Sequence, residues 1–169
     1  MKSSISWGPR LIAVAILCAA CGTSSAVATT TPTPMLPNGC RAGVPEAHVY
    51  TPDRLKVLDP CKHAEGVLVD VAAEDDGDYH LWFTPDPAYT YLMNPENHFQ
   101  GKPSMLAEIT PDCPGNPPDS SAAAKCPQTR LPIPKVGDHV AIDGPWVLDT
   151  NHGWNEIHPV DTITISGQM

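Results

Sequence analysis

The chain has 169 residues, the length of one small domain with short extensions, and its 19 acidic and 10 basic side chains give a net charge of −9. The Lys and Arg residues are scattered along the sequence and form no basic stripe. Proteins that bind DNA or RNA neutralise phosphates with clustered basic side chains, so this composition disfavours nucleic acid as a partner.

Residues 1–20 have the order of a bacterial signal peptide. Lys2 and Arg10 accompany an apolar run at 11–17, which is too short to span a bilayer but fits a signal-peptide core. The sequence L-C-A-A-C-G at 17–22 resembles a lipobox, with Cys18 where leucine is usual. We therefore predict cleavage before Cys21, lipidation of Cys21 and anchoring to a membrane of the cell envelope. Ordinary cleavage after Ala28, giving a secreted protein, is the alternative.

The predicted cleavage removes two positive charges, which takes the net charge from −9 to −11. Residues 21–39 begin at the lipid-anchor cysteine and continue as a stretch rich in Ser, Thr, Ala and Pro, with too few large apolar side chains to fold. We expect this stretch to be an extended tether. The folded domain is predicted at 40–169.

Four cysteines remain within the predicted domain, and an even number in an exported chain indicates two disulfides. We predict Cys40–Cys61 and Cys113–Cys126, the second of which closes a loop rich in Pro, Ser and Ala. A four-thiolate zinc site is disfavoured, because the sequence contains no C-x-x-C pair.

Apolar and polar residues in the domain alternate with a period of two, which is typical of strands. Val67, Val69 and Val71 are expected to face the core, and Asp75–Asp78 to form a hairpin turn. Residues 40–60 are expected to be irregular, and 88–93 to form one helical turn or an edge. Strands are predicted at 67–73, 79–84, 105–110, 138–148 with a bend at Gly144-Pro145, and 156–165 with a break at Pro159.

This pattern predicts an all-β domain, specifically a small five-stranded antiparallel OB-like barrel, with a β-sandwich as the alternative. The sequence from Gly137 to Pro159 resembles a group of uncharacterised bacterial OB-like domains, in which a strand G-x-x-V-x-V-x-G-x-W-V-x-D leads into H-G-W-x-E-I-H-P. The turn D-G-D-Y-H at 76–80 resembles the same group. The resemblance implies a fold and carries no established activity.

OB barrels bind ligands at the loop between strands one and two, the loop between strands four and five, and the face of strands two and three. The candidate ligand-binding residues at these places are His80, Trp82, Asp149, His152 and Trp154. A second hypothesis is a zinc-like divalent metal held by His152, Glu156 and His158. These side chains could equally pin the turn at Gly153 by hydrogen bonds.

No catalytic residue is predicted, because the sequence contains neither a G-x-S-x-G nucleophile motif nor a phosphate-binding glycine loop. The leading hypothesis is an exported, membrane-anchored lipoprotein without a cofactor, whose OB-like domain binds a small ligand or an envelope protein. A metal-dependent hydrolase and a nucleic-acid-binding OB domain are the alternatives.

Overall fold

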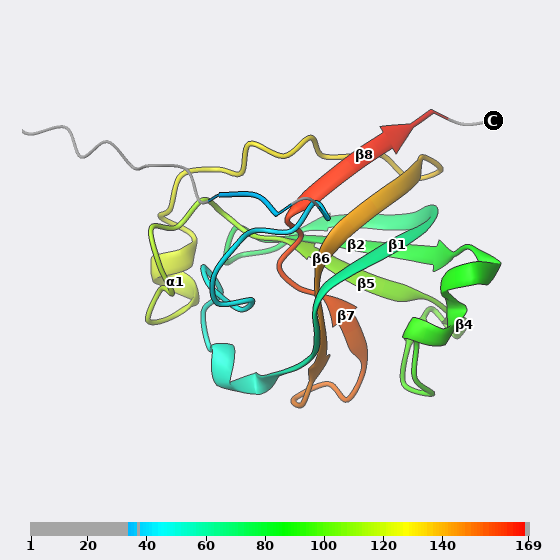
Figure 1. Cartoon of the computed structure of the whole chain (residues 1–169), viewed down its shortest axis with the longest axis horizontal. Helices are drawn as coiled ribbons and strands as arrows, with labels where there is room; N and C mark the ends of the chain where they lie inside the picture. Colours follow the sequence, from blue (N-terminus) through cyan, green and yellow to red (C-terminus); the bar gives the residue numbers. More distant parts are fainter. Residues whose placement is uncertain (1–33, 37, 168–169) are drawn as a thin grey trace, which may run out of the picture.

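The computed structural model describes residues 34–36 and 38–167 (Figure 1). The predicted signal peptide and the predicted lipidation of Cys21 therefore lie outside the described residues. Within the described ranges, no helix is long and apolar enough to cross a membrane. Strand is the predominant regular structure of the described residues, and the helices are short, so the prediction of an all-β protein is confirmed.

Eight strands and three short helices follow one another in the part of the chain that the structure describes. Their bounds are η1 Pro52–Arg54, β1 Leu55–Ala73, β2 Tyr79–Pro85, η2 Pro87–Leu92, β3 His98–Phe99, β4 Lys102–Pro103, β5 Met105–Ile109, α1 Ser120–Ala123, β6 His139–Asp149, β7 Asn155–Ile157 and β8 Thr162–Ser166. The predicted strands at 79–84, 105–110 and 138–148 correspond to β2, β5 and β6. The segment predicted at 88–93 forms the helical turn η2.

Six strands form one mixed sheet in the order β1-β2-β5-β7-β6-β8, and the pairing of β1 with β6 joins the sheet into a ring (Figure 1). Because β1 occupies one edge of β6, β7 and β8 share its other edge, β7 pairing with Trp146–Leu148 and β8 with His139–Asp143. The predicted fifth strand is thus present as two pieces.

The prediction of a purely antiparallel sheet is wrong, because β5 and β7 run parallel. The long connection after β5 and the whole of β6 separate these strands in sequence, which provides the crossover that a parallel pair requires.

The first strand differs from the prediction in both length and register. It begins at Leu55 and continues through Pro60, which lies where the pairing with β6 is irregular and no ladder hydrogen bond is needed from it. Val67 and Val69 are exposed and Leu68 is buried, so the predicted core face of this part is wrong. A bulge between Leu68 and Asp70 shifts the pleat by one residue, and Val71 beyond it packs against the core.

The core fills the ring and is built mainly from apolar side chains of β2, β5 and β6, among them Leu81, Phe83, Met105 and Ile142. Gly144 is required where β6 passes the chain that follows β7. A Cβ atom there would lie 2.4 Å from the Pro159 carbonyl oxygen. The predicted bend is therefore a site of close backbone approach within a continuous strand.

Both predicted disulfides, Cys40–Cys61 and Cys113–Cys126, are confirmed. They indicate an oxidising, extracytoplasmic environment. The first bond joins the N-terminal segment to β1. The same segment is also held at Arg41, whose backbone N–H donates to Asp161 Oδ2 at 2.9 Å.

Candidate functional site

A pocket of about 390 Å³ opens between the turn that joins β1 to β2 and the loop that joins β6 to β7. Segment 50–54 supplies a third wall. Four carboxylates line the pocket, together with Arg54, His80 and His152 among other residues; the carboxylates are Glu74, Asp75, Asp76 and Glu108. The pocket is therefore an acidic hollow at one end of the ring.

Arg54, the arginine in the wall of this pocket, is already paired with a carboxylate of the protein. The Arg54 guanidinium contacts Asp149 Oδ2, and the Asp149 side chain is completely buried. Asp149 also accepts hydrogen bonds from Asn151 N at 2.7 Å and from His152 N at 3.3 Å, and its Oδ2 lies 2.8 Å from His152 Nδ1. Asp149 thus ties the β6–β7 loop to the helical turn η1. The Arg54 guanidinium also lies 3.9 Å from Glu108 Oε2.

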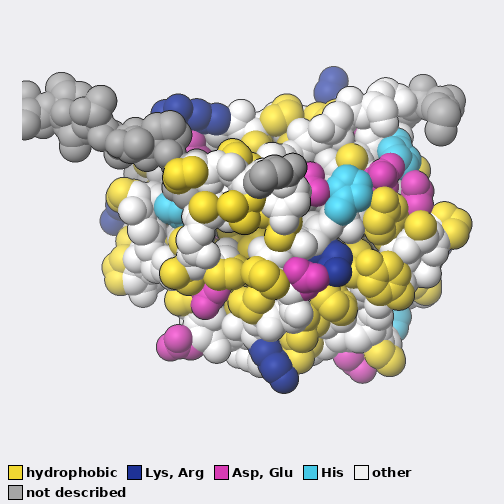
Figure 2. Space-filling view, in the orientation of Figure 1, with side chains coloured by type: hydrophobic (Ala, Val, Ile, Leu, Met, Phe, Trp, Pro, Cys, Tyr) yellow, Lys and Arg dark blue, Asp and Glu magenta, His cyan; other side chains and the backbone are white. Residues whose placement is uncertain are grey.

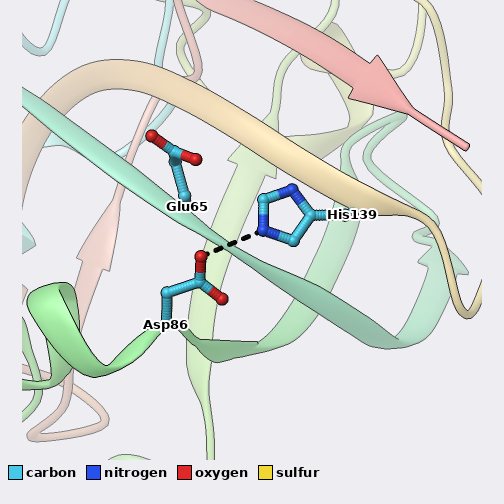
Figure 3. A group of neighbouring side chains, drawn as sticks. All are labelled: Glu65, Asp86 and His139. Carbon is cyan, nitrogen blue, oxygen red and sulfur yellow. Dashed lines mark hydrogen bonds and ion pairs between the residues drawn. The ribbon is translucent and has the colours of Figure 1, made fainter. Parts of the chain in front are cut away.

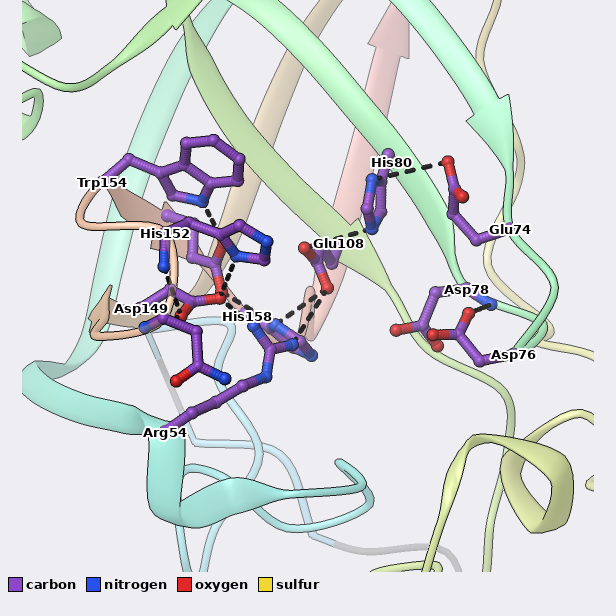
Figure 4. A network of polar contacts seen from close by, with 12 residues as sticks. Arg54, Glu74, Asp76, Asp78, His80, Glu108, Asp149, His152, Trp154 and His158 are labelled. Atoms are coloured by element: carbon purple, nitrogen blue, oxygen red, sulfur yellow. Dashed lines mark hydrogen bonds and ion pairs between the residues drawn. The ribbon is translucent and has the colours of Figure 1, made fainter.

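Glu108 projects from β5 and forms the floor of the pocket, with its side chain only 4% exposed. Its Oε1 lies 3.2 Å from His80 Nε2, and its Oε2 lies 2.9 Å from His158 Nδ1 (Figure 4). Burial acts to raise the pKa of Glu108, but the charge and hydrogen bond of His158, and then the charge of His80, outweigh it and lower the pKa to about 2. Glu108 is therefore a buried carboxylate in its ionised form.

His158 is completely buried directly after β7. Its Nδ1 lies 3.0 Å from Glu156 Oε1 as well as 2.9 Å from Glu108. Burial acts to lower the pKa of His158, but these two carboxylates outweigh it and raise the pKa to about 10. The other ring nitrogen, Nε2, is buried and has no hydrogen-bond partner among the residues that the structure describes.

Asp78 completes this buried group from the end of the β1–β2 turn. Burial, against the opposing charge of His158 and with the charge of Glu108, raises the pKa of Asp78 to about 7. One carboxylate oxygen each from Asp78 and Glu108 and one ring nitrogen of His158 lie within 4.8 Å of one another. These three side chains are of the kinds that ligate divalent metals.

The residues predicted from the sequence fall into two places. His80 and His152 line the pocket, and Asp149 supports its wall. Trp82 does not line the pocket; it is buried in a stack with Phe99, with ring centroids 5.3 Å apart, and meets Trp154 edge-on at 5.4 Å. Trp154 stacks on His152 with ring centroids 4.4 Å apart. The predicted ligand sites therefore converge at one end of the ring, with Trp82 in a packing role.

The three residues predicted to hold a metal are connected differently from the expectation. Trp154 Nε1 donates to Glu156 Oε2 at 2.9 Å, and the other oxygen of Glu156 faces His158. His152 is directed to Asp149 instead. The structure places His158 in a potential metal-binding group with Asp78 and Glu108, and neither His152 nor Glu156 belongs to that group.

Sequence reasoning missed Asp78, Glu108 and Arg54 as site residues. Glu108 had one available signal, because it is the only charged residue in the apolar strand 105–109. Asp78 was placed in the turn between the first two strands, where OB barrels bind ligands, but not among the candidate residues. Arg54 was assigned to an irregular segment, and nothing in its sequence context points to a buried partner almost 100 residues away, at Asp149.

A second group of metal-ligating residue types lies on the side of the ring, formed by Glu65 on β1, Asp86 after β2 and His139 on β6 (Figure 3). His139 Nε2 lies 3.0 Å from Asp86 Oδ2. Glu65 accepts a hydrogen bond from the Tyr89 hydroxyl at 3.1 Å and contacts His63. All three residues are partly exposed and satisfied by protein partners, so this group is explained as a surface polar network.

Comparisons of the chain with protein-family models, with curated proteins and with solved structures give no match. The function must therefore be argued from the geometry of the pocket and from the sequence.

Proposed function

We propose that this protein is an exported lipoprotein, anchored through Cys21, whose β domain binds a small cationic ligand in the acidic pocket. The signal-like residues 1–20 and the tether at 21–39 support export and anchoring. The two disulfides agree with an extracytoplasmic location.

The connectivity of the ring supports an OB-like barrel. With β7 and β8 counted as one broken strand, five strands close through the pairing of the first with the fourth, and the third runs parallel to the fifth. OB barrels bind ligands at the loop between strands one and two and the loop between strands four and five. In this chain those loops are the two that frame the pocket.

The observation that carries the proposal is the charge of the pocket. Four carboxylates line it. Glu108 among them is paired with His158, and Arg54 is paired with the buried Asp149, so Glu74, Asp75 and Asp76 give the pocket its negative charge. A low-dielectric hollow of one sign concentrates ligands of the opposite sign. A pocket of about 390 Å³ also suits a small molecule rather than a macromolecule.

Nucleic acid is disfavoured by the same charge. Figure 2 shows Lys and Arg side chains only singly on the face in view, interspersed with acidic and apolar side chains. Phosphate backbones require a continuous basic track, and the net charge of −9 repels them.

The binding proposal is tested with spermidine as a cationic probe and glutarate as an anionic one. Calorimetric titration of the full chain, purified in mild detergent, should show saturable spermidine binding and none of glutarate. Glu74→Gln/Asp76→Asn should weaken spermidine binding by about tenfold, the effect of roughly 1.4 kcal/mol from two removed charges. The matched control Asp70→Asn/Asp112→Asn removes two carboxylates that do not line the pocket. Equal weakening by both double variants would refute a specific pocket.

The anchoring proposal is tested separately by mass spectrometry of the mature N-terminus. A diacylated or triacylated Cys21 is expected, and its loss together with release from the membrane fraction is expected for Cys21→Ser. An unmodified N-terminus after Ala28 would show plain secretion instead.

A further inference from the structure

We propose that Ser166, His139 and Asp86 form a hydrolytic site for carboxylic esters on the outer face of the ring, with Ser166 as the nucleophile. Ser166 Oγ lies 3.3 Å from His139 Nδ1. On the other side of the ring, His139 Nε2 lies 3.0 Å from Asp86 Oδ2 (Figure 3). A serine, a histidine and a carboxylate linked in this order activate the serine in hydrolases, and such sites are recognised by geometry rather than by sequence position.

Asp86 determines which nitrogen of His139 can act as a base. A carboxylate only accepts hydrogen bonds, so the proton between the two side chains is on His139 Nε2. In the neutral ring, Nδ1 is then the acceptor, and it faces the Ser166 hydroxyl. The hydroxyl also lies 3.2 Å from the His139 carbonyl oxygen, so rotation about the Cβ–Oγ bond moves its proton between the two acceptors. Asp86 itself is held by its backbone N–H, which donates to Glu65 O at 2.9 Å.

The strand pairing brings the serine and the histidine together. Ser166, the last residue of β8, is directly opposite His139, the first residue of β6. Val67 of β1 is opposite His139 on the other edge of β6. Residues opposite each other on neighbouring strands present their side chains on the same side of the sheet. Ser166 and Val67 are exposed, so this row of side chains is on the outer face and the hydroxyl is accessible to a substrate.

The backbone N–H of Gly167 is a hydrogen-bond donor next to the hydroxyl. Attack by a serine produces a negatively charged oxygen, which hydrolases stabilise with backbone N–H groups, among them that of the residue after the nucleophile. Among the described residues, no backbone hydrogen bond outside the strands uses the Gly167 N–H. Apart from its chain neighbours, a Cβ atom on Gly167 would meet no described atom within 4 Å. The space beside this N–H can therefore admit the oxygen of a substrate.

Three exposed valines near the serine indicate the acid part of the ester. Val67 is opposite His139, Val69 is also exposed on β1, and Val136 precedes β6. An apolar acyl chain that covers these side chains removes apolar surface from water, which is favourable. The substrate class is therefore an ester of a short apolar acid. The three site residues do not line the acidic pocket, so this activity goes beyond the proposed cation binding and does not depend on it.

The reaction proceeds through an acyl-serine. Ser166 Oγ attacks the carbonyl carbon while its proton passes to His139 Nδ1, and Asp86 stabilises the imidazolium through Nε2–H. The bond to the alcohol oxygen then breaks, and the alcohol leaves with the Nδ1 proton. Water attacks the acyl-serine and gives a proton to Nδ1. That proton returns to Ser166 Oγ as the carboxylic acid is released. Ser166 and His139 are thus catalytic residues, and Asp86 is a positioning residue.

The test combines hydrolysis of p-nitrophenyl butyrate with labelling by a fluorophosphonate probe, both on the full chain in mild detergent. Saturable hydrolysis is expected, with the probe located on Ser166 by mass spectrometry. Ser166→Ala should lose the label and the hydrolysis, and His139→Asn should lower kcat at least about a hundredfold. Asp86→Asn should lower kcat at least about tenfold with KM unchanged, which a purely structural role would not produce.

Ser121→Ala and His98→Asn are the matched controls, because each removes an exposed residue of the same type outside the proposed site. Circular dichroism and thermal unfolding establish that every variant is folded. Absence of labelling and hydrolysis in the folded wild type, or a label that persists in Ser166→Ala, would overturn the inference. Activity lost in the controls as much as in the site variants would also overturn it. Spermidine binding measured on the same samples shows separately whether the cation-binding proposal holds.

Discussion

The pair formed by Arg54 and Asp149 provides a quantitative test of how the pocket wall is held. The two side chains are 10% and 0% exposed, so neither charge is hydrated in the folded protein. Arg54→Met retains the length of the side chain but leaves the Asp149 carboxylate buried without its cation. Removing one partner of a buried ion pair costs about 3–5 kcal/mol. Because Asn151 and His152 still donate to Asp149, we expect a loss of about 3 kcal/mol, at the lower end of that range.

The assay is urea unfolding of the oxidised full chain at pH 7, followed by tryptophan fluorescence, with the m-value required to stay constant. In a double-mutant cycle with Asp149→Asn, the two single changes should be non-additive by at least about 1 kcal/mol. Arg130→Met is the control. The Arg130 side chain is 91% exposed, and its Nε lies 3.5 Å from Asp112 Oδ2 in a surface ion pair. An Arg54→Met loss no larger than that of the control, or additive single changes, would refute the reasoning.

Three further predictions concern the fold around the site. Gly144→Ala should destabilise the domain by about 1–3 kcal/mol through overpacking against the adjacent backbone, seen as a lower Tm; an unchanged Tm would contradict the close approach. Cys113→Ser/Cys126→Ser, which opens a link across a sequence separation of 13, should cost about 3 kcal/mol in denaturant unfolding. A loss below about 1 kcal/mol would show that the loop is ordered without its bond. Burial acts to lower the pKa of His63, but its hydrogen bonds to nearby carboxylates, Asp143 first, raise the pKa above 6.5. The charged ring therefore stabilises the fold fully below pH 6.5, and this contribution disappears as the pH rises through the raised pKa. The stability difference between wild type and His63→Asn should shrink accordingly in a pH series, and a constant difference would count against it.

The strands of the domain follow from local sequence information. Alternation at 79–84 and 105–110 and the turn residues at 75–78 are short-range signals, and the structure has β2, β5 and the β1–β2 turn at those places. The Cys113–Cys126 pair was also predictable, because it closes a loop that has little apolar content of its own, and Cys40–Cys61 is then the remaining pair.

The register of β1 could not be predicted in the same way. The alternation of Val67, Val69 and Val71 is compatible with one face only if the strand is regular, and the bulge after Leu68 separates them between two faces. A bulge is fixed by pairing with β2 and β6, which a single strand sequence does not contain.

The buried group of Asp78, Glu108 and His158 could likewise not be predicted from the sequence. Asp78, Glu108 and His158 are 30 and 50 residues apart, and the closure of the ring brings them together. Sequence reasoning grouped His158 with its neighbours His152 and Glu156 because proximity in sequence was the only distance available. The structure instead assigns Glu156 to orienting His158 and His152 to the pocket wall.

The bond between Cys40 and Cys61 has a mechanical consequence for the membrane-anchored form that we propose. In that form, tension along the proposed tether would first load the backbone hydrogen bonds that join residues 34–36 to residues 40–42. Beyond them, the disulfide offers a covalent route from Cys40 into β1, a strand that pairs with β6 and then with β2. The covalent route bypasses residues 41–54. Since Tyr50, Thr51 and Arg54 in that segment form one wall of the pocket, the wall is outside the path of the force. The acidic pocket would thereby be shielded from tension on the proposed tether.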